Sequence, residues 1–320
     1  APAPTAQPEQ MVMCTDGAMV QLTSGDWREV KTVTFGEFRA HWDAKARKVV
    51  TKTDNISYFS RMETAEKFSH SALVEWHRRG GENAHTMVAV QDGALWIQSF
   101  IDYHCPQAVR VIDFAHALEY VATVGRTIHG AETEAFQQWY ARMAKQLGRQ
   151  PPQRTVNELW MLYRQHPDHP EGETIKLAIR YLEKRLRMID YPHFRRQQIP
   201  IGSGHVESGH KVVMQQRMKQ AGMRWAEENL NPMLALRVAL CNQTWKATWR
   251  EIDAGVRREK YSFKAKQSPA PKEATDPYVV TEKDCQRLTK LADRISKKKR
   301  HPWRNNKWIF PQRQNSIHKN

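Results

Sequence analysis

Three carboxylates stand at positions where phosphoryl-transfer chemistry could use them. Asp16 closes an apolar run that begins with MVMC, Asp92 closes the run TMVAVQ, and Glu207 follows a Gly-Ser-Gly loop at the start of a predicted helix. Strands that end at the same edge of a sheet bring their last side chains together, since adjacent strands lie roughly 4.8 Å apart. Three converging carboxylates repel each other unless cations neutralise them, and oxygen ligands suit Mg²⁺ or Mn²⁺. Two such ions, roughly 3.5–4 Å apart, could activate an attacking oxygen and stabilise a leaving one.

Each carboxylate also has a purely structural interpretation. Asp-Gly is a common turn pair, so Asp16 and Asp92 could each be a turn residue, and the sequence predicts a turn at Asp16-Gly17. Glu207 could do no more than complement the dipole of its helix. Taken singly, the three residues therefore leave both interpretations open, and the surrounding motifs have to decide.

The elements that would position these residues form an α/β pattern. Short apolar strands alternate with helices in the first part of the chain, which favours a sheet whose later strands are parallel and covered by helices. The predicted elements here are strands from Met11, over Trp27–Phe35, near Ile56–Phe59, over Thr86–Val90 and over Ala108–Ile112, and a helix over Thr64–Arg79.

From about residue 117 to 200 the pattern predicts only helices. Thr155–Glu158 matches a capping box that would open one of them, and an apolar stripe from Ile175 to Ile189 indicates a packing face. A long helix is predicted after Gly202-Ser203-Gly204, and Asn231-Pro232 is predicted to cap the next one.

The charge of the chain is concentrated at one end. Lys and Arg exceed Asp and Glu by 16, and residues 256–320 hold 18 of the Lys and Arg but only six of the Asp and Glu. Such a segment could be a solvated appendage, or it could attract nucleic acid phosphates, with Trp and Arg stacking on bases. The candidate DNA-binding residues are Lys211, Arg217, Lys219, Arg224, Trp225, Lys297, Lys298, Lys299 and Arg300.

Composition also limits where the chain could work. No uninterrupted apolar run reaches the roughly 18 residues that a membrane span needs, so no membrane association is expected. Residues 1–10 lack the features of a signal peptide, and the four cysteines are widely spaced and form no CxxC pair. These features predict a cytoplasmic protein, associated with the nucleoid if it binds DNA.

Several phrases resemble the DDE transposases of bacterial insertion sequences, in particular the Kra-type group, whose layout is related to that of the Mutator-like transposases. The phrases are CTDGAMV, WREVK, VAVQDG, VIDFAH, GSGHVESGHK, RMKQAGMRW and KRHPWR, and all but the last lie within residues 11–250. The resemblance implies an RNase H-like fold, two divalent ions (Mg²⁺ or Mn²⁺), and cleavage plus strand transfer at transposon ends. It also implies that Asp16, Asp92 and Glu207 are the catalytic, metal-binding set.

The resemblance adds a supporting pair and a way to choose between two aspartates. Asp113 and His116 match a C/DxxH motif that follows the second catalytic Asp in several of these families. Asp92 and Asp113 both end apolar strands, so the local pattern cannot choose between them. The implied strand order 3-2-1-4-5 places the strand of Asp92 beside that of Asp16, and on this basis Asp92 is predicted as the metal ligand.

The fold class predicted is α/β, an RNase H-like mixed sheet flanked by helices, with an all-α insertion before the last catalytic helix. The predicted segments are a linker from an absent upstream domain (1–10), the core (11–116), the helical insertion (117–200), the completion of the core with the Glu207 helix (201–254) and a basic tail (255–320).

The function predicted is DNA transposition. Its partners would be transposon ends and target DNA, bound by a homodimer or higher oligomer. Two alternatives remain open: an RNase H-like nuclease or junction resolvase that uses the same carboxylates without strand transfer, and a non-catalytic DNA-binding derivative of a transposase.

Overall fold

A five-stranded mixed sheet is the centre of the fold, with strand order β3-β2-β1-β4-β5. The computed structural model describes residues 8–45, 47–267, 286–287 and 289–290, the last part of α11 (260–267) by its backbone alone. The strands are β1 (Gln10–Gln21), β2 (Trp27–Asp43), β3 (Lys48–Arg61), β4 (Thr86–Gln91) and β5 (Val109–Ile112). β1 pairs antiparallel with β2 and parallel with β4, while β2–β3 is antiparallel and β4–β5 is parallel. The order is the one that was expected, and the α/β class is confirmed.

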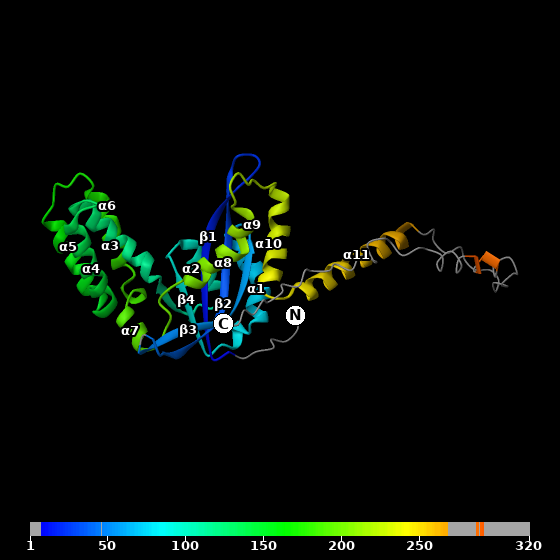
Figure 1. The fold of residues 1–320 in the computed structure, drawn as a ribbon, viewed down its shortest axis with the longest axis horizontal. Helices are drawn as coiled ribbons and strands as arrows, with labels where there is room; N and C mark the ends of the chain where they lie inside the picture. The colour runs from blue at the N-terminus through cyan, green and yellow to red at the C-terminus, as the bar shows by residue number, and fades with distance from the viewer. Residues whose placement is uncertain (1–7, 46, 268–285, 288, 291–320) are drawn as a thin grey trace, which may run out of the picture. The chain divides into compact units, whose positions relative to one another are not determined.

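Helices cover both faces of this sheet (Figure 1). The helices of the described residues are α1 (Ala65–Arg78), α2 (Leu95–His104), α3 (Phe114–His129), α4 (Glu134–Arg149), α5 (Pro152–Arg164), α6 (Gly172–Glu183), α7 (Tyr191–Arg196), α8 (Gly204–Gly209), the π-helical turn η3 (His210–Gln215), α9 (Gln216–Met218), α10 (Glu227–Cys241) and α11 (Trp245–Gln267), with short 3-10 turns η1 (Gly81–Asn83) and η2 (Leu186–Met188). The chain divides into two units, Ala1–Gly255 and Val256–Asn320, and the sheet with α1 to α10 belongs to the first.

Alternation along the strands gives each side of the sheet its own core, and a third cluster forms where η3, α9 and α10 pack on β1 and β2. On one face Met11, Met13 and Met87 pack with the apolar side chains of α1 and α2. On the other face Val12 and Cys14, with the neighbouring strands, share one core with α3 to α7. The helical insertion therefore packs directly on the sheet and has no separate core of its own.

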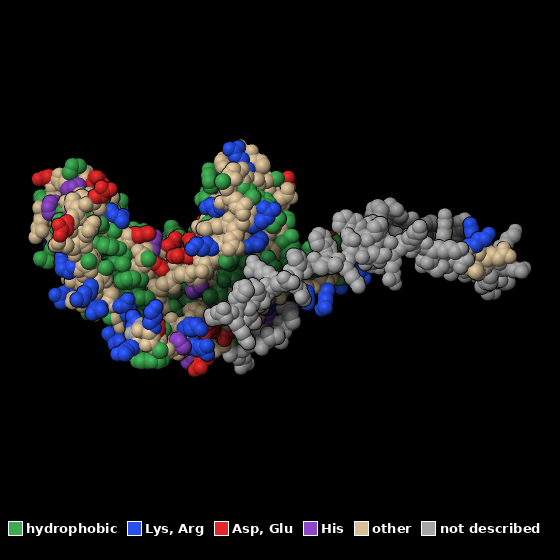
Figure 2. All heavy atoms as spheres, viewed as in Figure 1, with side chains coloured by type: hydrophobic (Ala, Val, Ile, Leu, Met, Phe, Trp, Pro, Cys, Tyr) green, Lys and Arg blue, Asp and Glu red, His purple; other side chains and the backbone are tan. Residues whose placement is uncertain are grey.

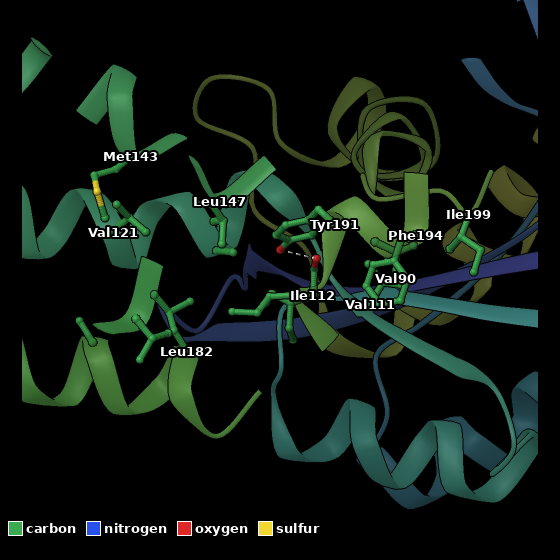
Figure 3. Close-up of a cluster of buried hydrophobic side chains, with 14 of the residues drawn as sticks. Val90, Val111, Ile112, Val121, Met143, Leu147, Leu182, Tyr191, Phe194 and Ile199 are labelled. Atoms are coloured by element: carbon green, nitrogen blue, oxygen red, sulfur yellow. Dashed lines mark hydrogen bonds between the residues drawn. The ribbon is translucent and has the colours of Figure 1, made fainter. Parts of the chain in front are cut away.

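Tyr191 of α7 shows how closely the insertion is attached to the sheet. Its ring is fully buried, packs edge-on against Phe114, and its hydroxyl donates a hydrogen bond of 2.9 Å to the carbonyl of Ile112 at the end of β5 (Figure 3). A buried hydroxyl needs such a partner, because leaving it unpaired costs free energy. The contact fixes the chain that leads from the insertion back to the sheet.

The turn predicted at Asp16-Gly17 is wrong. β1 continues through both residues, with Asp16 opposite Thr32 and Gly17 opposite Lys31, and the hairpin turns only after Leu22. Gly25 adopts a positive φ of 96° in that turn. The antiparallel pairing with β2 satisfies the backbone groups here, so a non-local interaction outweighs the local turn preference of Asp-Gly.

Two predicted helix starts are also wrong. α5 begins at Pro152, before the supposed capping box, because proline has a suitable φ for the first helical position, and Thr155 is buried within the helix. α10 begins at Glu227 and contains Pro232. The side chain of Asn231 is instead hydrogen-bonded to both backbone groups of Met62, which attaches α10 to the chain just after β3.

His104 at the end of α2 should make stability fall in mild acid. Its ring packs against those of Trp76, Phe100 and Tyr103. Burial lowers its pKa from the usual 6.5 to about 4, although the backbone of Ser69 favours the charged form. Between these two pH values the unfolded chain binds a proton that the folded chain does not, so the free energy of unfolding decreases as the pH falls from 6.5 towards 4.

His104→Phe is expected to reduce the slope of this dependence, because phenylalanine carries no titrating proton. Urea unfolding from pH 4.5 to 7.5 measures the slope. His70→Gln serves as the control, since that exposed histidine packs against the ring of Tyr103. An unchanged slope in His104→Phe would contradict the prediction.

Candidate active site

Asp16 lies on β1, and Asp92 directly follows the neighbouring parallel strand β4. The register of β1 and β4 runs from Gln10 opposite Thr86 to Cys14 opposite Val90, and two further residues along each chain bring Asp16 level with Asp92. Side chains two residues apart share a face of a sheet, so Asp16 lies on the face of Cys14. Burial is the main cause of the raised pKa of Asp16, and the negative charge of Asp92 adds to it.

The environment of Asp16 favours its neutral form more than water does. Burial is the main cause that raises its pKa, and the charges of Asp92 and Glu29 add to it, while His210 and the N–H of Gly17 act in the opposite direction. The Gly17 N–H donates a hydrogen bond of 2.7 Å to Oδ1. A partly buried carboxylate beside a second one is a site where a cation would be strongly favoured.

Asp92 is the first residue after β4, in a tight turn before α2. Its Oδ1 accepts a hydrogen bond of 2.9 Å from the N–H of Ala94, the residue before the helix. Gly93 has a positive φ of 90°, a conformation that L side chains rarely adopt, and its N–H is bound by the side chain of Gln91. The turn therefore has a defined backbone geometry that orients the Asp92 side chain.

Glu207 lies on α8, which crosses the sheet above β1 and β2. His205, two residues earlier, attaches the helix: its Nδ1 lies 2.7 Å from the Thr34 hydroxyl and its Nε2 lies 3.0 Å from Cys14 Sγ. Burial lowers the pKa of His205 to about 4, so its ring is neutral near pH 7. Since Cys14 is two residues before Asp16 on the same face, this contact brings α8 over the strand that carries Asp16, with Glu207 exposed.

His210, the residue that follows α8, connects this end of the helix to the Asp16 carboxylate. Its ring is buried, and Nδ1 lies 3.4 Å from Asp16 Oδ2. Burial lowers its pKa, and the negative charges of Asp16 and Glu207 oppose that shift. The chain is π-helical from His210 to Gln215, a conformation that is common at functional sites.

The sequence reasoning missed both histidines. His205 and His210 lie two residues before and three residues after Glu207, inside the motif GSGHVESGHK. The sequence did contain a signal for them, because each histidine lies within about one helical turn of the candidate glutamate. Their partners on β1 and β2 could not be identified without the tertiary structure.

Asp113 has a different environment from Asp92. It is buried at the start of α3, where Oδ1 accepts from the N–H of His116 at 3.0 Å and Oδ2 accepts from the N–H of Ser203 at 2.6 Å. Both carboxylate oxygens are thus bound by backbone groups, and the second bond fixes the loop that precedes α8. His116 lies 3.3 Å from Glu119 and edge-on to Tyr120 and Tyr181.

The candidate ligands Asp16, Asp92 and Glu207 offer carboxylate oxygen atoms, which suit Mg²⁺ or Mn²⁺ better than softer metals. Within the described residues, no three His, Cys, Asp or Glu side chains are grouped closely enough to form a metal site. Asp16, Asp92 and Glu207 therefore share one region of the sheet without meeting at ligand distances. Figure 2 shows acidic side chains gathered beside α8, on the side of the insertion.

Basic side chains lie on the segment that continues from α8. Lys211, Arg217, Lys219 and Arg224 are exposed. The guanidinium of Arg217 lies 5.3 Å from the centre of the Trp225 ring, and the backbone of Trp225 is hydrogen-bonded to Gln21 and Thr23 at the far end of β1. Lys and Arg side chains also gather over α9 and α10 in Figure 2. Lys297, Lys298, Lys299 and Arg300 lie outside the described residues.

A scan of the chain against protein-family models gives no match, and a search of curated proteins finds no similar sequence. Among the described residues, none of the helices has the length and apolar character to cross a membrane.

Proposed function

We propose that this chain is the catalytic part of a DNA transposase with an RNase H-like fold, which cuts DNA and joins DNA strands by metal-dependent phosphoryl transfer. The observation that carries the proposal is the placement of Asp16 on β1 and of Asp92 at the end of the neighbouring parallel strand β4, with the helix of Glu207 attached over β1. The strand order and the insertion before α8 support it. Two partly buried carboxylates whose charges repel each other are stabilised when a cation neutralises them, so a cation-binding role accounts for the two better than a purely structural one.

Asp16, Asp92 and Glu207 are the residues that would hold two Mg²⁺ or Mn²⁺ ions. Such ions, when bound, activate the attacking oxygen and stabilise the leaving oxygen of a phosphodiester. Burial and the negative charges of Asp92 and Glu29 raise the pKa of Asp16, and a bound cation would favour its charged form. His210 Nδ1 lies 3.4 Å from Asp16 Oδ2, and a protonated His210 ring favours the charged form of this carboxylate.

DNA is the partner that the charge distribution favours. Lys211 and Arg217 follow Glu207 on the same continuous helical segment and are exposed, so they could contact phosphates near the scissile bond. Lys219, Arg224 and Trp225 extend this surface. The protein would work on the nucleoid, as a homodimer or higher oligomer assembled on two DNA ends.

A strand-transfer assay tests the proposal. The substrate is a pre-cut duplex carrying the inverted repeat that flanks the coding sequence, with a free 3′-OH, and the target is a supercoiled plasmid in Mg²⁺ or Mn²⁺. Joined products are expected, and they should be absent when the 3′ end is a dideoxynucleotide. Cleavage of an uncut end without joining would indicate a nuclease or resolvase, and binding without either reaction would indicate a non-catalytic derivative.

Removal of residues 256–320 is expected to weaken DNA binding and to reduce its salt dependence. The segment carries 18 Lys and Arg against six Asp and Glu. Each phosphate contact that is lost should reduce the slope of log K against log salt by about 0.9. Fluorescence anisotropy with a labelled duplex at 50–300 mM salt, roughly the range over which such binding changes most, measures the slope. An unchanged slope would show that the segment is a solvated appendage.

A further inference from the structure

Two side chains of the helical insertion bind the backbone of the turn that carries Asp92. The Tyr181 hydroxyl on α6 donates a hydrogen bond to the carbonyl oxygen of Asp92. Arg185, just after α6, donates from Nη2 to the carbonyl oxygen of Gly93 at 3.2 Å. The two successive carbonyls of the turn are thus held by residues that lie about ninety positions further along the chain.

The ring of Tyr181 is held in a stack of three groups. Tyr120 of α3 lies parallel to it, with 3.7 Å between ring centres and 7° between planes. The guanidinium carbon of Arg185 lies 3.9 Å from the same ring centre. Because Tyr120 fills one face, the guanidinium must lie on the other, so neither face is open to a nucleobase. The stack fixes the direction of the Tyr181 hydroxyl.

The contact leaves no space between the turn and the insertion. A Cβ atom at Gly93 would lie 2.3 Å from the Tyr181 hydroxyl oxygen and 3.0 Å from Arg185 Nε. The same turn orients the Asp92 carboxylate through the hydrogen bond from the N–H of Ala94. A movement of α6 would therefore move the carboxylate.

We propose that Tyr181 and Arg185 are positioning residues, through which the helical insertion holds the Asp92 carboxylate beside Asp16; the part of this inference that concerns cleavage rests on the proposed function. Mg²⁺ requires a nearly ideal octahedral arrangement of its ligands. A loosened turn should therefore weaken binding of the ion at this site before it affects the rest of the fold. The insertion is then a part of the active site as well as a packing element.

Three variants and one matched control test the inference. Tyr181→Phe removes the hydroxyl and keeps the ring, Arg185→Lys keeps the charge and removes the planar fork, and Gly93→Ala introduces the methyl group that the contact excludes. Tyr140→Phe is the control, because Tyr140 belongs to α4 of the same insertion and stacks on Phe136.

The first measurement is hydrogen exchange of the amides of Gly93 and Ala94, which needs neither metal nor DNA. Loss of one hydrogen bond should make their exchange roughly tenfold faster in Tyr181→Phe, while amides in β1 stay unchanged. The second measurement is Mn²⁺ binding, followed by electron paramagnetic resonance, with Asp92→Asn as the reference for loss of the site. The dissociation constant should rise about five- to tenfold in Tyr181→Phe and Arg185→Lys and stay constant in Tyr140→Phe.

The outcomes separate the two proposals. If the variants lower the unfolding temperature but leave exchange at the turn and Mn²⁺ affinity as in the wild type, the two residues are merely structural and the inference is overturned. If the wild type neither cuts nor joins DNA, the proposed function fails, and the exchange measurement still decides whether the insertion positions the turn. If Tyr181→Phe does not fold, the same measurements are made on Arg185→Lys, in which Tyr120 and Tyr181 still stack.

Discussion

Replacing Glu207 with glutamine is expected to lower the rate of DNA cleavage by about 100-fold or more, because loss of one charged ligand removes several kcal/mol of stabilisation from a metal-assisted transition state. Glutamine keeps the size and shape of the side chain. Glu207 is exposed on α8, and the packing of this helix depends on His205, Val206 and Gly209. The substitution should therefore leave the fold and the affinity for DNA unchanged.

Single-turnover cleavage of a labelled end, with enzyme in excess, measures the effect separately from binding. Glu228→Gln is the matched control, since Glu228 is another exposed glutamate and lies in the first turn of α10. Cleavage by Glu207→Gln at more than a few per cent of the wild-type rate would remove Glu207 from the catalytic set.

The sequence allowed the strands that carry the site to be predicted because their apolar runs are local signals. The runs that end near Asp92 and Asp113 contribute buried residues to the sheet, and each leads through a short turn into its helix. The position of Asp92 after a strand depends only on these neighbouring residues. The order of the strands followed from the family resemblance, and the structure has that order.

The environment of Asp16 could not be predicted, because it is built by residues distant in sequence. β1 continues past Asp16 because it pairs with β2 there. His210, which contacts the carboxylate, comes after the insertion in the sequence. The Cys14–His205 contact, which attaches the Glu207 helix, joins residues 191 positions apart. No periodicity or turn preference reports such a contact, so only the three-dimensional structure could identify it.

Asp92→Asn should reduce DNA cleavage more than it reduces stability, and Asp113→Asn should reduce stability more than it reduces cleavage. Asp92 is half-buried, and its charge acts on Asp16. Asp113 is buried, and its two oxygens accept hydrogen bonds from His116 and Ser203. A carboxylate that already satisfies two backbone donors is suited to hold a structure together, and it would have to give up those bonds to reach a metal ion.

The Asp92→Asn variant is therefore expected to lose cleavage by about 100-fold or more at nearly unchanged stability. Asp113→Asn is expected to lose about 1–3 kcal/mol of stability, because its amide cannot accept both backbone hydrogen bonds in the same geometry. Urea unfolding and single-turnover cleavage at a temperature where both variants are folded measure the two quantities.

The combination of results decides which aspartate belongs with Asp16. Loss of cleavage in Asp113→Asn beyond its effect on the folded fraction, together with an active Asp92→Asn, would reverse the assignment. Asp113→Asn should also displace α8, because the Ser203 amide that Asp113 binds lies at the start of the helix that carries Glu207. Some loss of cleavage in Asp113→Asn is thus expected, and it should coincide with faster hydrogen exchange of the Ser203 amide. A loss of cleavage without that change would show that Asp113 acts on the chemistry directly.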